Sequence, residues 1–597
     1  MANRDNFGTI LDRRKAGAGV STTTSDHGTK SEFLKNPKAG KIPSFPGEYE
    51  LQKLTLTSPN RKGYVDIKAA WSDFNIYEDL FGNFLTGNIQ IVDGVGLMES
   101  VPIIGEETIH IQAKTKGITK QRNQTAIPGP FEGSRNEGIL DLKFRVISLS
   151  DIVKLNEGVQ SYKLSFVSEE AILNLKQKVK KSALDPASFE PRKISDVVKF
   201  LYRQFFKKGR QAVAKKLFVE PTKNLTDLVI PNQPPFKAFN FLASRAVSAG
   251  KHAVGSSFVF YETIRGFFFI SMETLMAGGG LGYSTVAGAP GSPTELVYTA
   301  PEDPVLETYV VTPKRMGSQK DETQNIAIEM TAVDTYSFSS NFDVLQNLTA
   351  GMYANRLLTH DLVRMKYDTL DFNSYDPSSL GEKTSITKEG ATEVLEFLEQ
   401  AADAKNFTDE FTHLGTGKLS TEKQDALGSP ESVMCFYPSN FAHDVRFKDA
   451  IGTQGVKGET KENASPNIQP NRVEQWMQSR LVQSQQSSNI KLNIRAPGLS
   501  TRAVGDLIEF KLPTSYLEDR AGHTASPNHT YLSGYYLITK LRHHFTKEKY
   551  EIEFEAIKDS LKVPPGKDRS IQEADDTTTT GRPPAAVNPE TGRTGPK

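Results

Sequence analysis

The sequence has almost no cysteine, no long apolar run and no excess of charge of either sign. Cys435 is the single cysteine in 597 residues, which excludes an intramolecular disulfide framework and any cysteine-ligated zinc or iron–sulfur site. No run approaches the ~20 consecutive apolar residues of a membrane helix, and the stretch up to Thr24 lacks the apolar core of a signal peptide. We therefore expect synthesis in a cytoplasm without a membrane anchor, and stability from packing or assembly.

The composition is that of a folded protein with several domains. The net charge of +1 excludes a whole-chain polyelectrolyte but leaves room for local patches. Hydrophobic residues make up 37% and charged residues 24%, which suffices for globular folding. Because single cores rarely grow beyond ~250–300 residues, a chain of this length is expected to form more than one domain.

Two polar ends flank the patterned part of the chain. Residues 1–46 carry eight Lys/Arg against four Asp/Glu, with only scattered apolar residues. This composition predicts an extended arm that is ordered where a partner covers it. Residues 563–597, rich in Thr and Pro, predict a flexible C-terminal tail.

Two regions show the two-residue period of β-strands. Residues 47–168 contain several short alternating segments, such as "GNIQIVDG", which places Ile89 and Ile91 on one face. Residues 481–562 repeat the pattern and end in a strictly alternating strand, "KYEIEFEAIKD". Short strands separated by turn residues predict a small antiparallel barrel or sandwich in each region.

Residues 169–300 combine helix and strand signals and predict an α/β domain. The segment 194–206 has the apolar stripe of an amphipathic helix, with Ser195 as its N-cap. A second helix is expected to begin near Pro235. Two apolar strands about a turn at Arg265 and Gly266 predict a hairpin.

The remaining segments connect the α/β domain to the second β region. Residues 301–380 predict connecting strands and an amphipathic helix, and residues 381–480 predict a mostly helical insertion. The apolar residues that define the helix of the first segment are Phe342, Leu345, Leu348 and Met352; those that define a helix at the end of the second are Val473, Trp476, Met477 and Leu481.

Two short echoes relate the β regions. "IIGEETIHI" and "AVGDLIEFK" both place a Gly and an acid before an alternating strand, and "FLTGNIQIV" is similar to "YLSGYYLIT". The pairs occur in opposite order along the two regions, so a simple tandem repeat does not follow.

The candidate ligand sites have ordinary structural explanations. "GGGLGYS", residues 278–284, has no following Lys and favours a flexible connector over a phosphate-binding loop. His523, His529, His543 and His544 could supply imidazole ligands to a transition metal, but the adjacent pair in a strand point to opposite faces. His110 is expected to be a surface or interface residue. No metal or cofactor is therefore predicted.

No catalytic constellation is evident. No G-x-S-x-G turn lies between an apolar strand and a helix. The acidic pairs Glu106-Glu107 and Glu169-Glu170 are expected at strand ends, as ordinary turn and edge residues. A glycosidase pair is defined by a spatial separation that sequence does not give.

Residues 171–216 carry thirteen Lys/Arg against three Asp/Glu. Lys199 and Arg203 lie away from the apolar stripe of their helix, on a face open to solvent or to an acidic partner. Nucleic-acid binding is one hypothesis. The aromatic residues belong to the apolar stripe rather than alternating with the charges, which favours a solvated face or a protein contact.

The stretch 74–112, "FNIYEDLFGNFLTGNIQIVDGVGLMESVPIIGEETIHIQ", resembles the N-terminal tube-like domain of the baseplate hub subunits of contractile-tailed bacteriophages. "PFKAFNFLASRAVS", "FDVLQNLTAGMYANRLLTHDL" and "VGDLIEFKLP" are similar to later segments of that family. The resemblance spans roughly residues 47–370 and 470–562, in family order. It does not include the arm, the insertion or the tail.

This resemblance implies an α+β fold with two tube-like β-barrel domains and no enzymatic activity. It implies a homotrimer in the virion whose six barrels form a ring between a six-fold tail tube and a three-fold central spike. Tape-measure and surrounding baseplate proteins would be further partners, and DNA would pass through the ring without specific binding. Two alternatives stay open: a cell-wall hydrolase using residues 381–470, and a nucleic-acid-binding module using residues 171–216.

Overall fold

The computed structural model describes most of the patterned part of the chain. The described residues are 43–59, 63–101, 103–116, 139–179, 193–207, 215–222, 230–249, 257–276, 284–285, 296–297, 307–311, 329–340, 343–361, 366–373, 433–438, 489–513 and 532–558, with single residues between 477 and 485 and at 528–529.

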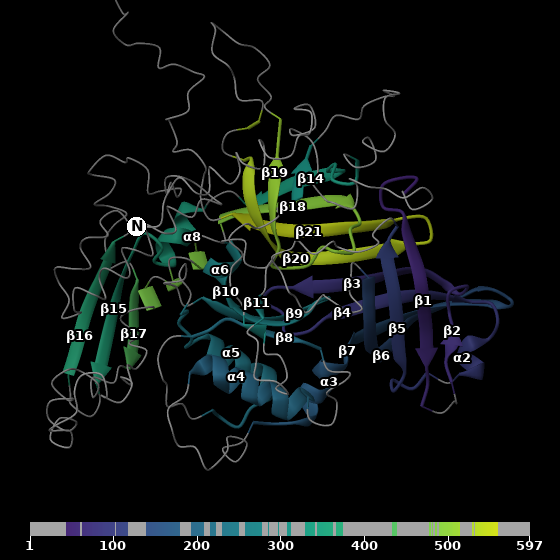
Figure 1. Cartoon of the computed structure of the whole chain (residues 1–597), viewed down its shortest axis with the longest axis horizontal. Coiled ribbons are helices and arrows are strands. Elements are labelled where there is room, and N and C mark those ends of the chain that lie inside the picture. Colours follow the sequence, from purple (N-terminus) through teal and green to yellow (C-terminus); the bar gives the residue numbers. More distant parts are fainter. Residues whose placement is uncertain are drawn as a thin grey trace, which may run out of the picture.

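One large sheet contains both predicted β regions (Figure 1). We call its first part the N-terminal unit: β1 (Tyr49–Thr57), β2 (Val65–Asp66), β3 (Trp71–Asp79), β4 (Thr86–Asp93), β5 (Thr108–Thr115), β6 (Ile139–Asn156) and β7 (Val159–Ser168). The C-terminal unit comprises β13 (Glu307–Val310), β14 (Thr335–Ser340), β18 (Ile490–Pro497), β19 (Leu507–Lys511), β20 (Gly534–Thr546) and β21 (Tyr550–Lys558). A short helix, α2 (Leu97–Ser100), follows β4.

The alternation predicted from sequence is confirmed in the strands. Ile89 and Ile91 of β4 are fully buried, and their neighbours are half-buried. Ile109 and Ile111 of β5 follow the same pattern. β4 and β5 therefore present one fully buried face to the core and one half-buried face away from it.

The two units share one topology. The sheet order is β3-β4-β7-β6-β5-β1 in the N-terminal unit and β14-β18-β21-β20-β19-β13 in the C-terminal unit, and the six strands of each follow in the same chain order. The ladders between equivalent neighbours are antiparallel, except that β13 runs parallel to β19 where β1 runs antiparallel to β5. The second unit is thus a structural repeat of the first.

Residue registers agree with this repeat. In both units a bulge interrupts the long strand, after Val146 in β6 and after Ile538 in β20. The N–H of Val146 donates to the carbonyl of Glu107 at 3.0 Å, and the N–H of Ile538 donates to that of Asp506 at 3.0 Å. Residues that pair across neighbouring strands form equivalent rows in the two units. Across β6, β7, β4 and β3 one row is Leu149, Leu164, Ile89 and Phe74. Its counterpart across β20, β21, β18 and β14 is Leu541, Phe554, Ile494 and Tyr336.

Two separate closed barrels are not confirmed. Among the described strands the sheet is open, running from β14 at one end to β1 and β2 at the other. Beyond its bulge β20 leaves β19 and pairs with β3, so the two units share one continuous sheet. Among the described strands, the units pair edge to edge through β3 and β20, and neither unit closes upon itself.

The α/β part packs below this sheet (Figure 1). Its own five-stranded sheet, in the order β11-β12-β8-β10-β9, is covered by α4 and α5 across a core of phenylalanines. The elements are α3 (Glu169–Lys176), α4 (Ile194–Tyr202), a π-helical turn η3 (Arg203–Lys207), β8 (Leu217–Val219), α5 (Pro235–Ala243), β9 (Phe258–Thr263), β10 (Gly266–Ser271), α6 (Met272–Met276), β11 (Ser284–Thr285) and β12 (Leu296–Val297).

Most expectations for this part are confirmed, and two need correction. β9 and β10 form the hairpin about Arg265 and Gly266, and Pro235 begins α5. Ser195 does not cap α4: Lys193 holds the N-cap position, and the buried Ser195 donates its N–H to Thr222 Oγ1 at 3.0 Å. The sequence predicts the apolar segment IRGFFFISMETLM as the second strand of the hairpin, but only its first part is a strand: after Ser271 it forms the helix α6.

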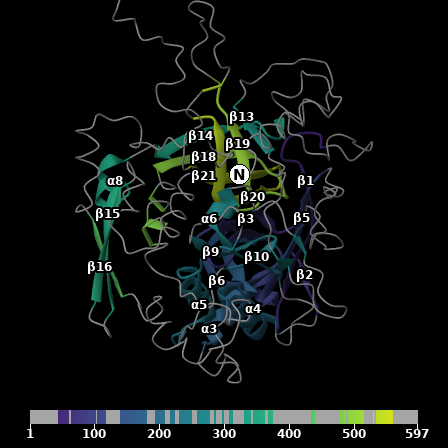
Figure 2. The ribbon, with the colours of Figure 1, turned by 60° about the vertical axis from the view of Figure 1, so that its left-hand side comes forward.

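A separate three-stranded sheet lies to one side of the main sheet in both views (Figures 1 and 2). It contains β15 (Ala354–Asp361), β16 (Lys366–Asn373) and β17 (Met434–Pro438). Two of its strands belong to the connecting segment 301–380 and the third to the insertion 381–480, whose described residues 433–438 thus contain a strand where the sequence predicts a mostly helical segment. The helix predicted through Met352 is too long: α8 (Val344–Thr349) is capped by Asp343 and ends before Gly351, whose φ is +75°. Residues 1–42, 374–432, 439–476 and 559–597 lie outside the described part, so the arm, most of the insertion and the tail stay predictions.

Candidate functional site at the junction of the two units

Aromatic rings join the two units where β3 meets β20. Phe545 of β20 lies opposite Phe74 of β3, and the two rings stack at 4.5 Å between centroids. Tyr550 of β21 stacks on the other side of Phe545 at 4.0 Å. A Cβ at Gly498 would lie 2.2 Å from the Tyr550 ring, so glycine is required there for this close packing.

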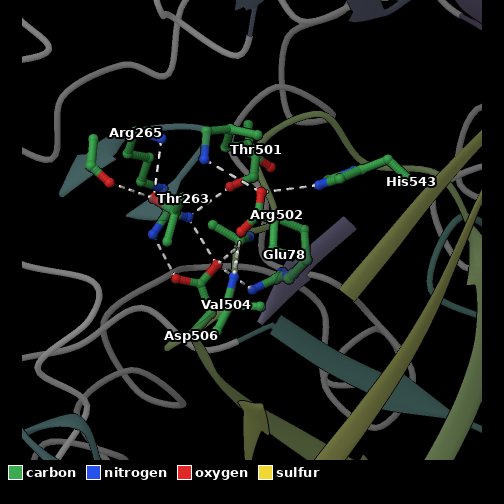
Figure 3. A network of polar contacts seen from close by, with 11 residues as sticks. Glu78, Thr263, Arg265, Thr501, Arg502, Val504, Asp506 and His543 are labelled. Atoms are coloured by element: carbon green, nitrogen blue, oxygen red, sulfur yellow. Dashed lines mark hydrogen bonds and ion pairs between the residues drawn. The ribbon is translucent and has the colours of Figure 1, made fainter. Parts of the chain in front are cut away.

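Glu78 of β3 is a buried carboxylate that contacts three parts of the fold (Figure 3). It accepts hydrogen bonds from the N–H of Val504 at 2.9 Å and the N–H of Ile264 at 3.3 Å. Its Oε1 lies 3.1 Å from Nε2 of the fully buried His543, whose Nδ1 lies 2.7 Å from the hydroxyl of Tyr550. One side chain thereby ties together the N-terminal unit, the C-terminal unit and the β9–β10 turn.

Asp506 holds two guanidinium groups beside Glu78 (Figure 3). Arg265, on the β9–β10 turn, donates to its two oxygens at 2.5 and 2.7 Å, and Arg502 donates at 3.3 Å. Burial lowers the pKa of Arg502, and the carboxylate of Asp506 opposes this effect. Because all three groups are largely buried, the carboxylate is needed to balance the two cations.

The first sequence echo marks equivalent places in the two units, although the registers match Asp506 with Glu107 and not with Glu106, which follows Gly105 directly. Gly105 and Gly505 both have positive φ, +92° and +87°. The buried acids that follow, Glu107 and Asp506, precede equivalent strands and accept backbone N–H groups: Glu107 from residues 104 and 105, Asp506 from residue 503. The second echo is wrong, because it compares β4 with β20, which occupy different places in the two units.

A groove of about 840 Å³ lies on the polar face of the sheet across the junction. Charged residues of opposite sign alternate along it, so that neighbouring strands neutralise each other. Within its lining, Lys540 pairs with Glu555 and Arg542 with Glu553; Arg495, which also lines it, pairs with Glu551.

The pairing of Glu551 predicts an acid-dependent loss of stability. Burial acts to raise the pKa of Glu551, but hydrogen bonds from Lys549 and Arg495 outweigh it and lower the pKa below the ordinary 4.5. A depressed pKa in the folded state stabilises the fold above about pH 4.5, and that contribution disappears as the pH falls through the folded value. The pKa of His544, 3.9 Å from Glu551, is lowered by burial and by Arg542.

We expect Glu551→Gln to cost about 1 kcal/mol at pH 7, with the difference from wild type shrinking as the pH falls below the ordinary value of 4.5 and through the lowered pKa of Glu551. Urea unfolding at a fixed protein concentration, at pH 7, 5, 4 and 3.5, measures this difference. A difference that stays constant across these pH values would show that the carboxylate is not stabilised by its partners.

The histidines do not assemble into one ligand set in the described part of the chain. His543 points into the core, and His544 lies on the opposite face near Glu551, as their adjacency in a strand predicted. His529 accepts from the N–H of Leu532 at 3.2 Å, and His523 lies outside the described residues. Across the described ranges, no three His, Cys, Asp or Glu side chains gather into a group that could hold a metal ion.

The other singled-out polar residues have structural roles. His110 pairs with Asp141 at 2.6 Å. Glu107 is a turn residue, as expected, but Glu169 and Glu170 begin the helix α3 instead of ending a strand. The buried Glu170 lies 3.4 Å from Lys215.

The basic stretch is only partly a surface feature. Arg203 is exposed, and Lys199 lies 3.7 Å from Asp196 on the same helix. Lys215 pairs with the buried carboxylates of Glu262 and Glu170. At least one cation of this stretch therefore neutralises internal charge.

Two further expectations concern loops and membranes. Of the glycine-rich segment 278–284, only Ser284 is described, as the first residue of β11. In the described ranges no helix has the length and apolar character to cross a bilayer.

No protein-family model matches the sequence, and no curated protein matches it. Among solved structures, the chain is similar to a tail protein from Neisseria meningitidis, with 9% identity over 86% of this chain and 97% of that one and a TM-score of 0.38. It is similar to a 43 kDa tail protein of prophage MuSo2 from Shewanella oneidensis, with 8% identity over 86% and 100% and a TM-score of 0.38. A type VI secretion system component from E. coli, with structural similarity to T4 tail proteins, gives 8% identity over 87% and 79% and a TM-score of 0.28. These neighbours are tail and secretion-system components.

Proposed function

We propose that the chain is a structural virion protein: a trimeric baseplate hub that joins the six-fold tail tube to the three-fold central spike of a contractile phage tail. The observation that carries this proposal is the repeat of one unit, side by side in a single sheet. Three copies of a chain with two equivalent units present six similar units to a six-fold partner, while the whole chains repeat three-fold toward the spike. The sequence resemblance to baseplate hubs supports the same assembly.

The polar face of the sheet suits the wall of a water-filled passage. Across β18, β20 and β21 its cations and carboxylates pair with one another, so this part of the face has little unbalanced charge to hold a polyanion. DNA would pass through such a ring without specific binding. The arm 1–46, the insertion 381–480 and the tail 563–597 would contact neighbouring tail parts, including the tape-measure protein and the surrounding baseplate.

Mass photometry and negative-stain electron microscopy of the full-length chain test this function. We expect particles of three times the 66.0 kDa chain mass and ring-shaped class averages with six similar lobes. Single chains at micromolar concentration, with no ring in the images, would contradict the proposal.

A further inference from the structure

One amine and two acids lie together in the α/β part, close to the N-terminal unit. Lys215 lies just before β8, Glu262 is on β9, and Glu170 is in the first turn of α3. Nζ of Lys215 contacts Oε1 of Glu262 and lies 3.4 Å from Oε2 of Glu170. Both acids are buried, and the lysine side chain is 20% exposed. A primary amine is therefore held against a carboxyl group, with a second carboxyl group beside it.

The charges of this trio determine which acid is neutral. Two carboxylates beside one ammonium leave an excess negative charge, which burial disfavours. Burial raises the pKa of Glu262, and the charge of Glu170 adds to this effect, although Lys215 opposes it. Burial acts to lower the pKa of Lys215, but the two acids outweigh it and raise the pKa. The trio therefore holds an ammonium at Lys215, a carboxylate at Glu170 and a neutral carboxylic acid at Glu262.

The second oxygen of Glu262 is held by two donors from the N-terminal unit. Oε2 accepts from the N–H of Leu85 at 2.9 Å and from the hydroxyl of Ser168 at 2.7 Å. When a nucleophile adds to the carboxyl carbon, negative charge develops on this oxygen. Donors already in place stabilise that charge, as in an oxyanion hole.

The position of the amine is fixed as well. The hydroxyl of Tyr202 donates to the backbone carbonyl of Lys215 at 2.7 Å, and Nζ lies 6.0 Å from the centre of the Phe267 ring. Oε2 of Glu170 accepts no hydrogen bond from any described residue, so it is available to take a proton from Nζ. Reacting groups held in contact in this way behave as if at a very high concentration.

From this geometry we propose that the side chains of Lys215 and Glu262 join in an isopeptide bond, which the folded chain forms by itself. The ammonium of Lys215 gives a proton to Glu170, and the free amine adds to the carboxyl carbon of the neutral Glu262. Glu170 then passes this proton to the leaving hydroxyl group and takes another from the nitrogen. The C–N bond forms, the carbon–hydroxyl bond breaks, one water leaves, and Glu170 ends protonated. The reaction needs no oxidant and no external reagent.

The bond would cross-link the α/β part across its central strand. β8 and β9 pair with opposite edges of β10, so the link closes the chain into a loop from position 215 to position 262. Such a link restricts the unfolded chain in the way that a disulfide does, in a protein whose single cysteine excludes an internal disulfide. The proposal does not depend on how many copies assemble.

The mass of the denatured, full-length chain tests the proposal without any substitution. Once removal of the initiator methionine is allowed for, we expect a mass lower than that of the sequence by one water molecule. A tryptic digest should contain a branched peptide that joins the segment around Lys215 to the segment around Glu262. A chain with the full sequence mass and no branched peptide overturns the proposal, and shows that the two side chains form an ion pair only.

Three variants locate the reaction. Lys215→Arg keeps the cation but removes the primary amine, and Glu170→Gln removes the proton acceptor; both should retain the full sequence mass. Lys216→Arg, at the exposed neighbouring position, is the matched control and should lose one water as wild type does. Circular dichroism shows whether each variant folds, and the wild-type mass decides the question if one of them does not.

The variants also give results that contradict the proposal. A water loss that persists in Lys215→Arg comes from another site and overturns the Lys215–Glu262 bond. Complete linkage in Glu170→Gln overturns the role of Glu170 as the proton acceptor.

Discussion

Replacing Asp506 with alanine is expected to lower the free energy of unfolding by about 3–5 kcal/mol, the cost of leaving a buried charge without its partner. The carboxylate is fully buried and accepts from Arg265 and Arg502 as well as from the N–H of Ala503. Without it, two guanidinium groups would lie side by side with no balancing charge. Urea unfolding at a fixed protein concentration measures the loss.

The matched control is an acid in an exposed ion pair. Glu555→Ala removes the partner of Lys540, whose side chain is 53% exposed, and should cost less than about 1 kcal/mol. If Asp506→Ala and Glu555→Ala lowered the free energy of unfolding equally, burial would not explain the contribution of the Asp506 network to stability. Asp506→Asn should fall between them, because it keeps the acceptor oxygen but removes the charge.

Glu78→Ala is expected to cost about 3 kcal/mol, because it leaves two buried N–H groups and the imidazole of His543 without their acceptor. The N–H groups belong to Ile264 and Val504, on different parts of the fold. Amide hydrogen exchange should therefore speed up at both positions in the variant. Glu78→Gln retains one acceptor oxygen and should cost less.

Glu509→Ala is the matched control for Glu78→Ala, because Glu509 makes a half-buried pair with Lys511. It should leave exchange at Ile264 and Val504 unchanged. Slow exchange at these two amides in Glu78→Ala would show that the carboxylate does not hold the three parts together.

The local elements could be predicted because their signals are local. The alternation of Ile89 and Ile91 and the turn at Arg265 and Gly266 each specify a structure within ten residues. The helix predicted through Met352 failed because its apolar spacing continued past the point where Gly351 ends the helix and β15 pairs with a strand distant in sequence.

The closure of the sheet could not be read from sequence, because it depends on which edges meet. Isolated alternation is compatible with a closed barrel and with an open sheet, and the pairing of β3 with β20 joins strands from opposite ends of the chain. The repeat itself was visible only where a Gly and an acid precede β5 and β19.

The junction network was missed, although the sequence carried a signal for it. Glu78 has the same strand parity as the buried Phe74 and Ile76, and His543 has that of Leu541 and Phe545. An acid and a histidine, each on the apolar face of a strand, indicate a buried pair. Only the fold shows that the two strands are neighbours.

The β3–β20 ladder also determines how the two units resist mechanical load. Seven consecutive residues, from Asp73 to Asp79, pair with residues of β20. A pull along the strands would shear all of these backbone hydrogen bonds together, whereas a pull across them would open the ladder one pair at a time. The junction should therefore bear force well in the strand direction and poorly at right angles to it.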